Sequence, residues 1–112
     1  MLIHNAYFWL KKDLTDEERT IFESELTVLA DIPYLASGFV GKPARGPRRP
    51  LTDHTFDYAT SLHFKTLVDH DYYHSGCSTH ARFIEYCSGY WEKIVIHEIR
   101  RLNLEQPELR HR

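Results

Sequence analysis

The sequence has few cysteines and no long apolar run, and both absences narrow the class of protein. Its 112 residues include only two cysteines, too few for the disulfide framework of a small secreted domain. No segment approaches the ~20 apolar residues that a membrane-spanning helix requires. The N-terminal residues also lack the basic start and the small-residue cleavage site of a signal peptide. We therefore expect a cytoplasmic protein with reduced thiols and no membrane partner.

An excess of charge of one sign is also missing. The chain has 14 Lys and Arg residues against 16 Asp and Glu residues, a net charge of −2, which gives no electrostatic reason to expect a nucleic-acid partner. Hydrophobic residues make up 42% of the sequence and aromatic residues 13%, which favours a folded globule over disorder. We expect one domain over residues 1–101 and a mobile C-terminal tail over residues 102–112.

Hydrophobic spacing predicts four strands and two long helices. The predicted strands cover residues 2–10, 34–40, 54–64 and 93–99. The predicted helices run from 15 to 30 and from Ser78 or Thr79 to about Trp91, with a short helix or turn at 66–73. The order βαββαβ predicts an α+β, ferredoxin-like fold, in which helices cover one face of an antiparallel four-stranded sheet.

The two faces of the first predicted strand differ in what covers them. Tyr7 and Trp9 point to one face, while His4 and Phe8 point to the other. The helices can cover only one face of the sheet, so the other leaves an apolar patch that predicts a partner. We expect a second copy of the chain there, which gives a homodimer with a barrel-like interior, a dimeric α/β barrel. The register places two more histidines on this outer face, His63 and His97.

The third predicted strand follows a segment rich in proline and basic residues. GKPARGPRRP, residues 41–50, contains three prolines, two glycines and four basic residues, which excludes regular structure. We favour a solvated hairpin loop, and the alternative is a lid or a dimer arm over a pocket. In the strand after it, alternation places five residues on one face: Phe56, Tyr58, Thr60, Leu62 and Phe64.

Two histidines are expected to point into the space between helices and sheet. His4 shares its strand face with apolar residues, and His80 shares a helix face with Ile84, Cys87 and Trp91. A histidine in such a place can act as a general base, and a tyrosine nearby can donate a hydrogen bond to a carbonyl oxygen. Taken alone, the residues favour a plainer interpretation, in which both are core histidines bonded to the backbone or to each other.

The segment HDYYHSGCSTH, residues 70–80, allows two further interpretations. His70, His74, Cys77 and His80 offer metal-ligand atoms, but Gly76 interrupts the helix that would align them and no CxxC or HExxH pattern is present. We therefore assign no metal and no other cofactor. Cys77 precedes a helix N-terminus, where a thiol can become a nucleophile, although a small residue at a helix start is the more common explanation.

Several pieces of the chain together resemble the stress-responsive dimeric α/β barrel (Dabb) family. They are IHNAYFWL at the first strand, LTDEER at the first helix, FDYATSLHF after the long loop, CSTHARF at the last helix and YWEKIVIHEI at the last strand. The order and spacing of these pieces carry the resemblance, which spans residues 2 to about 100.

The resemblance implies a ligand pocket between the sheet and the helices of each subunit. A plant polyketide cyclase of the family performs an aldol condensation in this pocket without metal or organic cofactor. His80 corresponds to its catalytic histidine, His4 to a histidine that lines the pocket, and Tyr58 to a position where the cyclase has another pocket histidine. The residues expected around a ligand are Phe8, Tyr72, Tyr73, His74 and Ile84.

The expected function is therefore the binding of a small molecule, with cyclase- or lyase-type acid–base chemistry. His80 would be the general base, and His4 and Tyr58 would orient the substrate. The alternative is a non-enzymatic structural or stress-associated homodimer whose core is filled by its own side chains. A cavity beside His80 and His4 distinguishes the two.

Overall fold

Strand β1 (Leu2–Leu10) lies in the interior of a four-stranded sheet in the computed structural model, which describes residues 1–102. The other strands are β2 (Ser37–Gly41), β3 (Tyr58–Phe64) and β4 (Trp91–Arg100). Their order across the sheet is β2-β3-β1-β4, and each neighbouring pair is antiparallel. This confirms the ferredoxin-like α+β fold. The predicted mobile tail, apart from the exposed Leu102, lies outside the described residues.

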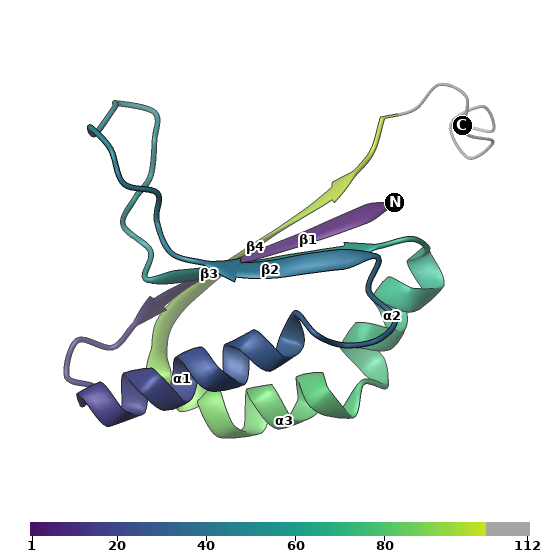
Figure 1. The fold of residues 1–112 in the computed structure, drawn as a ribbon, viewed down its shortest axis with the longest axis horizontal. Helices are drawn as coiled ribbons and strands as arrows, with labels where there is room; N and C mark the ends of the chain where they lie inside the picture. The colour runs from purple at the N-terminus through teal and green to yellow at the C-terminus, as the bar shows by residue number, and fades with distance from the viewer. Residues whose placement is uncertain (103–112) are drawn as a thin grey trace.

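The helices all lie on one face of the sheet (Figure 1). They are α1 (Asp16–Leu29), α2 (Leu67–Ser75) and α3 (Ser78–Cys87). The predicted capping box starts α1: the Glu18 amide donates to the Thr15 hydroxyl at 3.1 Å, and the Thr15 amide donates to the Glu18 carboxylate at 2.9 Å. Over residues 1–102, no helix is long and apolar enough to cross a bilayer.

The alternation of β1 divides its side chains as predicted. The face toward the helices carries His4, Ala6, Phe8 and Leu10, each at most 4% exposed. The Phe8 ring lies 5.4 Å from Phe22 of α1 and 5.9 Å from Phe83 of α3, between ring centroids. Edge-on aromatic packing of this kind fixes both helices against the sheet, and His4 stands at the end of this apolar row.

Strand β3 begins at Tyr58, four residues later than predicted. Asp57 ends the loop instead, because its carboxylate accepts a hydrogen bond from the Leu10 amide at 2.7 Å. Phe56 therefore does not share the buried face of Tyr58. Its ring packs against Tyr7 on the outer face, with 5.2 Å between centroids.

The segment between β3 and β4 contains two short helices, α2 and α3. Helix α2 lies where the sequence predicted a short helix or turn, and α3 is shorter than the helix predicted to run to about Trp91. Helix α3 ends at Cys87, and a 3₁₀ turn, Ser88–Tyr90, leads into β4. Its N-cap residue is Cys77, not the predicted serine or threonine. Trp91 therefore belongs to β4, but it still reaches the core, where its ring stacks on Phe83 at 5.7 Å.

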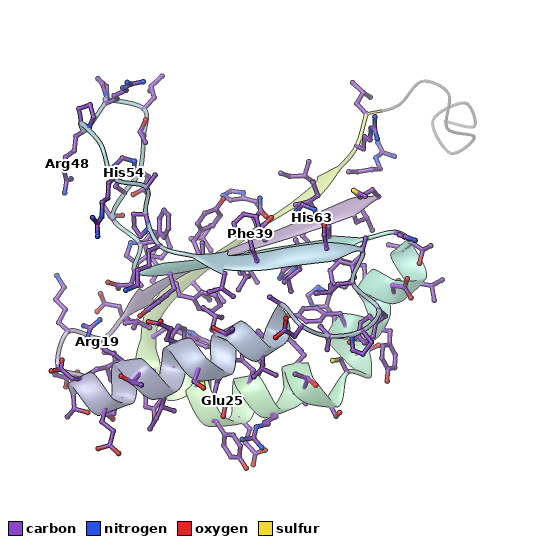
Figure 2. All side chains as sticks on the ribbon, in the orientation of Figure 1. Arg19, Glu25, Phe39, Arg48, His54 and His63 are labelled. Carbon is purple, nitrogen blue, oxygen red and sulfur yellow. The ribbon has the colours of Figure 1, made fainter. Side chains whose placement is uncertain are left out.

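The loop from 42 to 57 contains no helix or strand, which confirms the prediction for residues 42–50 and corrects the strand predicted from residue 54. It rises from the sheet on the side away from the helices (Figure 1). Arg48 and His54 lie in this loop, and Phe39 and His63 stand on the same side of the sheet (Figure 2). The loop is therefore not a lid over the space between sheet and helices, and it borders the outer face instead.

Candidate functional site

The pairing of β1 with β4 places His4 directly beside Glu98. The two residues are Cα partners in the sheet, and His4 Nδ1 lies 3.2 Å from Glu98 Oε2. Alternation along β4 turns Glu98 toward the helices, because its neighbour His97 faces the outer side, with its ring 5.9 Å from Tyr7. The site therefore starts from a buried imidazole paired with a carboxylate on the edge strand.

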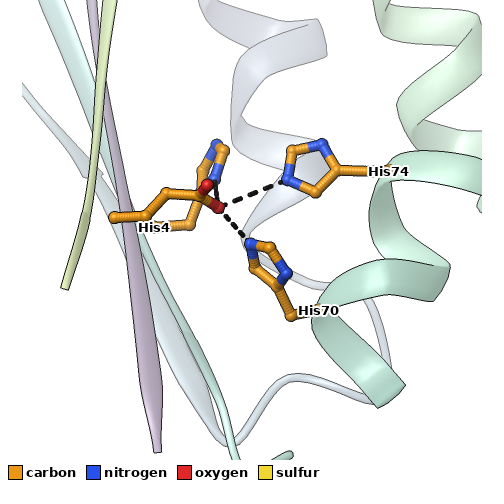
Figure 3. Close-up of side chains that lie close together, drawn as sticks. His4, His70 and His74 are labelled. Atoms are coloured by element: carbon orange, nitrogen blue, oxygen red, sulfur yellow. Dashed lines mark hydrogen bonds and ion pairs between the residues drawn. The ribbon is translucent and has the colours of Figure 1, made fainter. Parts of the chain in front are cut away.

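Helix α2 adds two more histidines to the same carboxylate. A spacing of four places His70 and His74 on one face of the helix, and Figure 3 shows their rings turned toward His4. His70 Nε2 hydrogen-bonds Glu98 Oε2, and His74 Nε2 lies 3.5 Å from the same oxygen. The other nitrogen of His70, Nδ1, lies 3.1 Å from Asp71 Oδ1. Three imidazoles from two elements thus surround one carboxylate oxygen.

His80, in the first turn of α3, joins this group through Tyr73. The Tyr73 ring is 3% exposed, and its centroid lies 4.4 Å from that of His80 and 5.6 Å from that of His4. The rings of His74 and His80 are 5.8 Å apart. Tyr73 therefore packs between the two histidines that the sequence singled out.

A cavity of about 230 Å³ lies in front of these rings, between the sheet and helices α2 and α3. Its polar lining consists of His4, Thr60, Tyr73, His74 and His80, and its apolar lining includes Ala6, Phe8, Phe83 and Ile84. Ile84, Ile94 and Ile96 line the cavity and are 36–46% exposed, so they mark its mouth. An engineered protein cavity of about 150 Å³ binds benzene, so this volume suits a ligand of about one aromatic ring.

Burial governs the protonation state of His4 and His80, two of the three histidines that line the cavity. It lowers the pKa of His80, and the neighbouring His74 and His4 lower that pKa further. Burial also lowers the pKa of His4, against the opposing effect of its hydrogen bond with Glu98. Both imidazoles are therefore neutral near pH 7, the form that can accept a proton. Burial raises the pKa of Tyr73, so its hydroxyl remains a donor.

Glu98 and His70 shift in the opposite sense. Burial disfavours the carboxylate, but hydrogen bonds from His70 and His4 outweigh it and lower the pKa of Glu98 to about 2. For His70, burial is likewise outweighed by hydrogen bonds with Glu98 and Asp71, and its pKa is raised. The site thus separates into Glu98 and His70, whose hydrogen bonds favour their charged forms, and His4 and His80, whose burial favours their neutral forms.

The structure brings together most of the residues predicted for the site. His80, His4, Tyr73, His74, Ile84 and Phe8 all line the one cavity. Tyr58 does not, because its hydroxyl points toward α1 and donates to Glu23 Oε2 at 2.6 Å. Tyr72 is 51% exposed and packs on Tyr34 outside the cavity, with 5.2 Å between ring centroids. Tyr58 is therefore not placed to orient a ligand in this cavity, contrary to the prediction from the sequence.

Glu98 was not predicted from the sequence, and His70 and His74 were grouped there with Cys77 and His80 as possible metal ligands. The alternation that assigned His97 to the outer face also assigns Glu98 to the inner face, so the signal was present. Four residues bring ligand atoms within 4.8 Å of one another, namely His4, His70, His74 and Glu98. The set considered from sequence included Cys77 and His80 instead. Cys77 is buried at the N-cap of α3 and lies outside this group.

Comparison with known families fits this architecture. The model of the stress-responsive A/B barrel domain, Dabb, matches residues 2–100. The chain belongs to the Dabb family. No curated protein sequence matches this Dabb chain.

Solved structures share the Dabb chain's fold at low sequence identity. The At3g17210 protein of Arabidopsis thaliana has a TM-score of 0.72 and 14% identity, covering 95% of this chain and 100% of its own. A hydroxynitrile lyase from Passiflora edulis has a TM-score of 0.71 and 17% identity, covering 95% and 96%. A protein from Thermobifida fusca, described as dimeric and ferredoxin-like, has a TM-score of 0.68 and 17% identity, covering 88% of each chain. These likenesses support the fold.

Proposed function

We propose that this chain is a homodimer that binds a small molecule in the cavity beside His80 and His4, and that it uses acid–base chemistry of the lyase or cyclase type. The observation that carries the proposal is the cavity itself, with a volume of about 230 Å³ and neutral imidazoles in its wall. A core filled by its own side chains leaves no such space. The isoleucines at the mouth favour a ligand with an apolar body.

His80 is the general base in this proposal. It removes a proton from a hydroxyl or an acidic C–H group of the ligand, and the electron pair released breaks or forms the adjacent carbon–carbon bond. In the cleavage direction the hydroxyl carbon becomes a carbonyl, and the leaving group takes the proton back from the imidazolium. Tyr73 replaces Tyr58 as the hydrogen-bond donor to the oxygen that carries the developing charge. His4 orients the ligand, since its Nδ1 is held by Glu98 and Nε2 is the nitrogen left for it.

The lyase direction has one further support. The hydroxynitrile lyase from Passiflora edulis shares this fold over nearly its whole length. Small aromatic hydroxynitriles and their aldehydes therefore make the first probes, and they match the cavity in size. The dimer rests on the uncovered sheet face and on relatives described as dimeric.

Turnover of these probes by His80→Ala tests the catalytic role. We expect release of aldehyde by the unaltered protein and a loss of at least about 100-fold in His80→Ala, with unchanged mass in light scattering and an unchanged unfolding midpoint. His54→Ala, in the loop on the other side of the sheet, is the matched control and should retain full turnover. Equal turnover by His80→Ala contradicts the catalytic role. A filled cavity would favour the non-enzymatic alternative.

A further inference from the structure

Three histidines and one glutamate converge on a single point beside the cavity, and the proposed acid–base reaction does not use that convergence. We propose that this point is a binding site for a tetrahedral divalent metal ion, with zinc as its best-fitting occupant, formed by His4, His70, His74 and Glu98. The inference departs from the sequence prediction that the chain holds no metal. It does not rest on the proposed reaction, because His80 is outside the group.

Two of the three donor-atom spacings around Glu98 Oε2 already fit zinc, and the third, from His70 Nε2, is shorter and would lengthen when a metal binds. Zinc bonds of about 2.0–2.1 Å at tetrahedral angles place neighbouring donor atoms roughly 3.3–3.4 Å apart. His4 Nδ1 lies 3.2 Å from Glu98 Oε2, and His74 Nε2 lies 3.5 Å from the same atom. All four donor atoms lie within 4.8 Å of one another, so small side-chain rotations bring the remaining pairs to the same spacing.

The kind of donor atom selects the metal. Three imidazole nitrogens and one carboxylate oxygen suit zinc and its neighbours in the first transition row. Calcium and magnesium prefer sites built from oxygen atoms alone. Neither thiol belongs to the group, which removes the soft ligands that select copper(I).

The chain also supplies the outer contacts that a metal-binding histidine requires. His70 Nδ1 lies 3.1 Å from Asp71 Oδ1, and a proton held there leaves the lone pair of Nε2 for a metal. His4 is 3% exposed, and its ring is held by Tyr73 at 5.6 Å between centroids. His70 and His4 are thus oriented by contacts outside the metal site, and the i, i+4 spacing on α2 places His74 on the same helix face as His70.

A plain hydrogen-bond network is the competing explanation, because one carboxylate oxygen can accept bonds from several imidazole N–H groups. The two explanations differ in what the group binds. A network has no affinity for zinc beyond that of scattered surface histidines, whereas a metal site binds about one ion per chain and loses it when any ligand is removed.

The experiment uses the full chain without a histidine tag, stripped with EDTA and titrated with zinc chloride in a calorimeter. We expect binding of about one zinc ion per chain. His70→Ala should weaken binding by more than about 100-fold, and Asp71→Asn, which alters only the outer contact, by roughly 10- to 100-fold. Glu98→Gln keeps the side-chain shape and should weaken binding by at least about tenfold. Thermal melts in EDTA verify that each variant is folded.

Two controls make the outcome decisive. His54→Ala removes a histidine from the distant loop and should bind zinc like the unaltered protein. His80→Ala should also keep its zinc while it loses turnover, which separates this inference from the proposed reaction. Visible absorption of the cobalt-substituted protein reports tetrahedral geometry. The proposal is overturned if the unaltered protein binds no zinc, or if His70→Ala and Glu98→Gln bind it as tightly as His54→Ala does.

Discussion

His4 and Glu98 are direct partners across β1 and β4, with His4 Nδ1 3.2 Å from Glu98 Oε2. The pair joins a buried central strand to an edge strand. It marks the boundary between two parts of the site: the cavity in front of His80, and the group of imidazoles on Glu98.

Ala6→Leu tests whether the space beside His4 is hollow. Ala6 is 4% exposed and lines the cavity, so a larger side chain can fill existing space. We expect the free energy of unfolding to change by less than about 1 kcal/mol, and binding of aromatic probes to be lost. Cys87→Leu, at a fully buried position, is the control and should cost about 1–3 kcal/mol. A similar cost for Ala6→Leu in urea denaturation would mean that the space is already filled.

Tyr73→Phe and Tyr58→Phe test which tyrosine serves the reaction. Removing a donor to a developing oxyanion costs about 10²- to 10³-fold in kcat, and we expect this loss in Tyr73→Phe. Tyr58→Phe removes a hydrogen bond to Glu23 and should lower the stability of the fold by about 1 kcal/mol. Steady-state kinetics with hydroxynitrile probes measure kcat of both variants, and urea denaturation measures the change in stability. If the large loss follows Tyr58 instead, the assignment made from sequence was right.

Phe39→Asp tests the outer face of the sheet as the dimer interface. Phe39 is 61% exposed in the single chain, so its replacement should leave the fold intact. A carboxylate placed against an apolar partner should weaken dimerisation by at least about tenfold for each copy. Light scattering over a dilution series measures the effect. Ile21→Asp, on a helix away from that face and 40% exposed, is the control, and equal dissociation by the two variants would exclude this interface.

The thiols should be unreactive in the folded protein. Burial raises the pKa of Cys87 to about 11, which leaves roughly 0.1% thiolate at pH 8, and Cys77 is 6% exposed. Both should react with a thiol reagent only after denaturation, as followed by mass spectrometry. Rapid labelling of Cys77 in the native chain would restore the nucleophile interpretation.

Most of the fold could be predicted from the sequence because the patterns that specify it, strand alternation and helix capping, are local and agree with one another. Alternation in β1 assigned His4 and Phe8 to the helix side, and the capping box at Thr15 fixed the start of α1. Strand β3 was predicted too early because the tertiary contact between Asp57 and Leu10 leaves no trace in residue spacing.

The site was less predictable because it depends on contacts between distant segments. His80 was predicted from helical phase and from the family resemblance, and Tyr73 was predicted only as one of two neighbouring tyrosines, Tyr72 and Tyr73. Glu98 lies 94 residues from His4 in the chain, and only the sheet register brings the two together. Tyr58 lies on the predicted face of its strand, but its long side chain places the hydroxyl against Glu23 on α1. Alternation along the strand does not predict that contact. The cytoplasmic location stays a prediction.

A crystal structure of the dimer soaked with a panel of small aromatic aldehydes and hydroxy compounds tests the central claim most directly. We expect a probe in the cavity, with its oxygen within hydrogen-bonding distance of Tyr73 or His80, and no such probe in crystals of Ala6→Leu. A cavity occupied by the chain's own side chains, with no probe bound at saturating concentration, would contradict it.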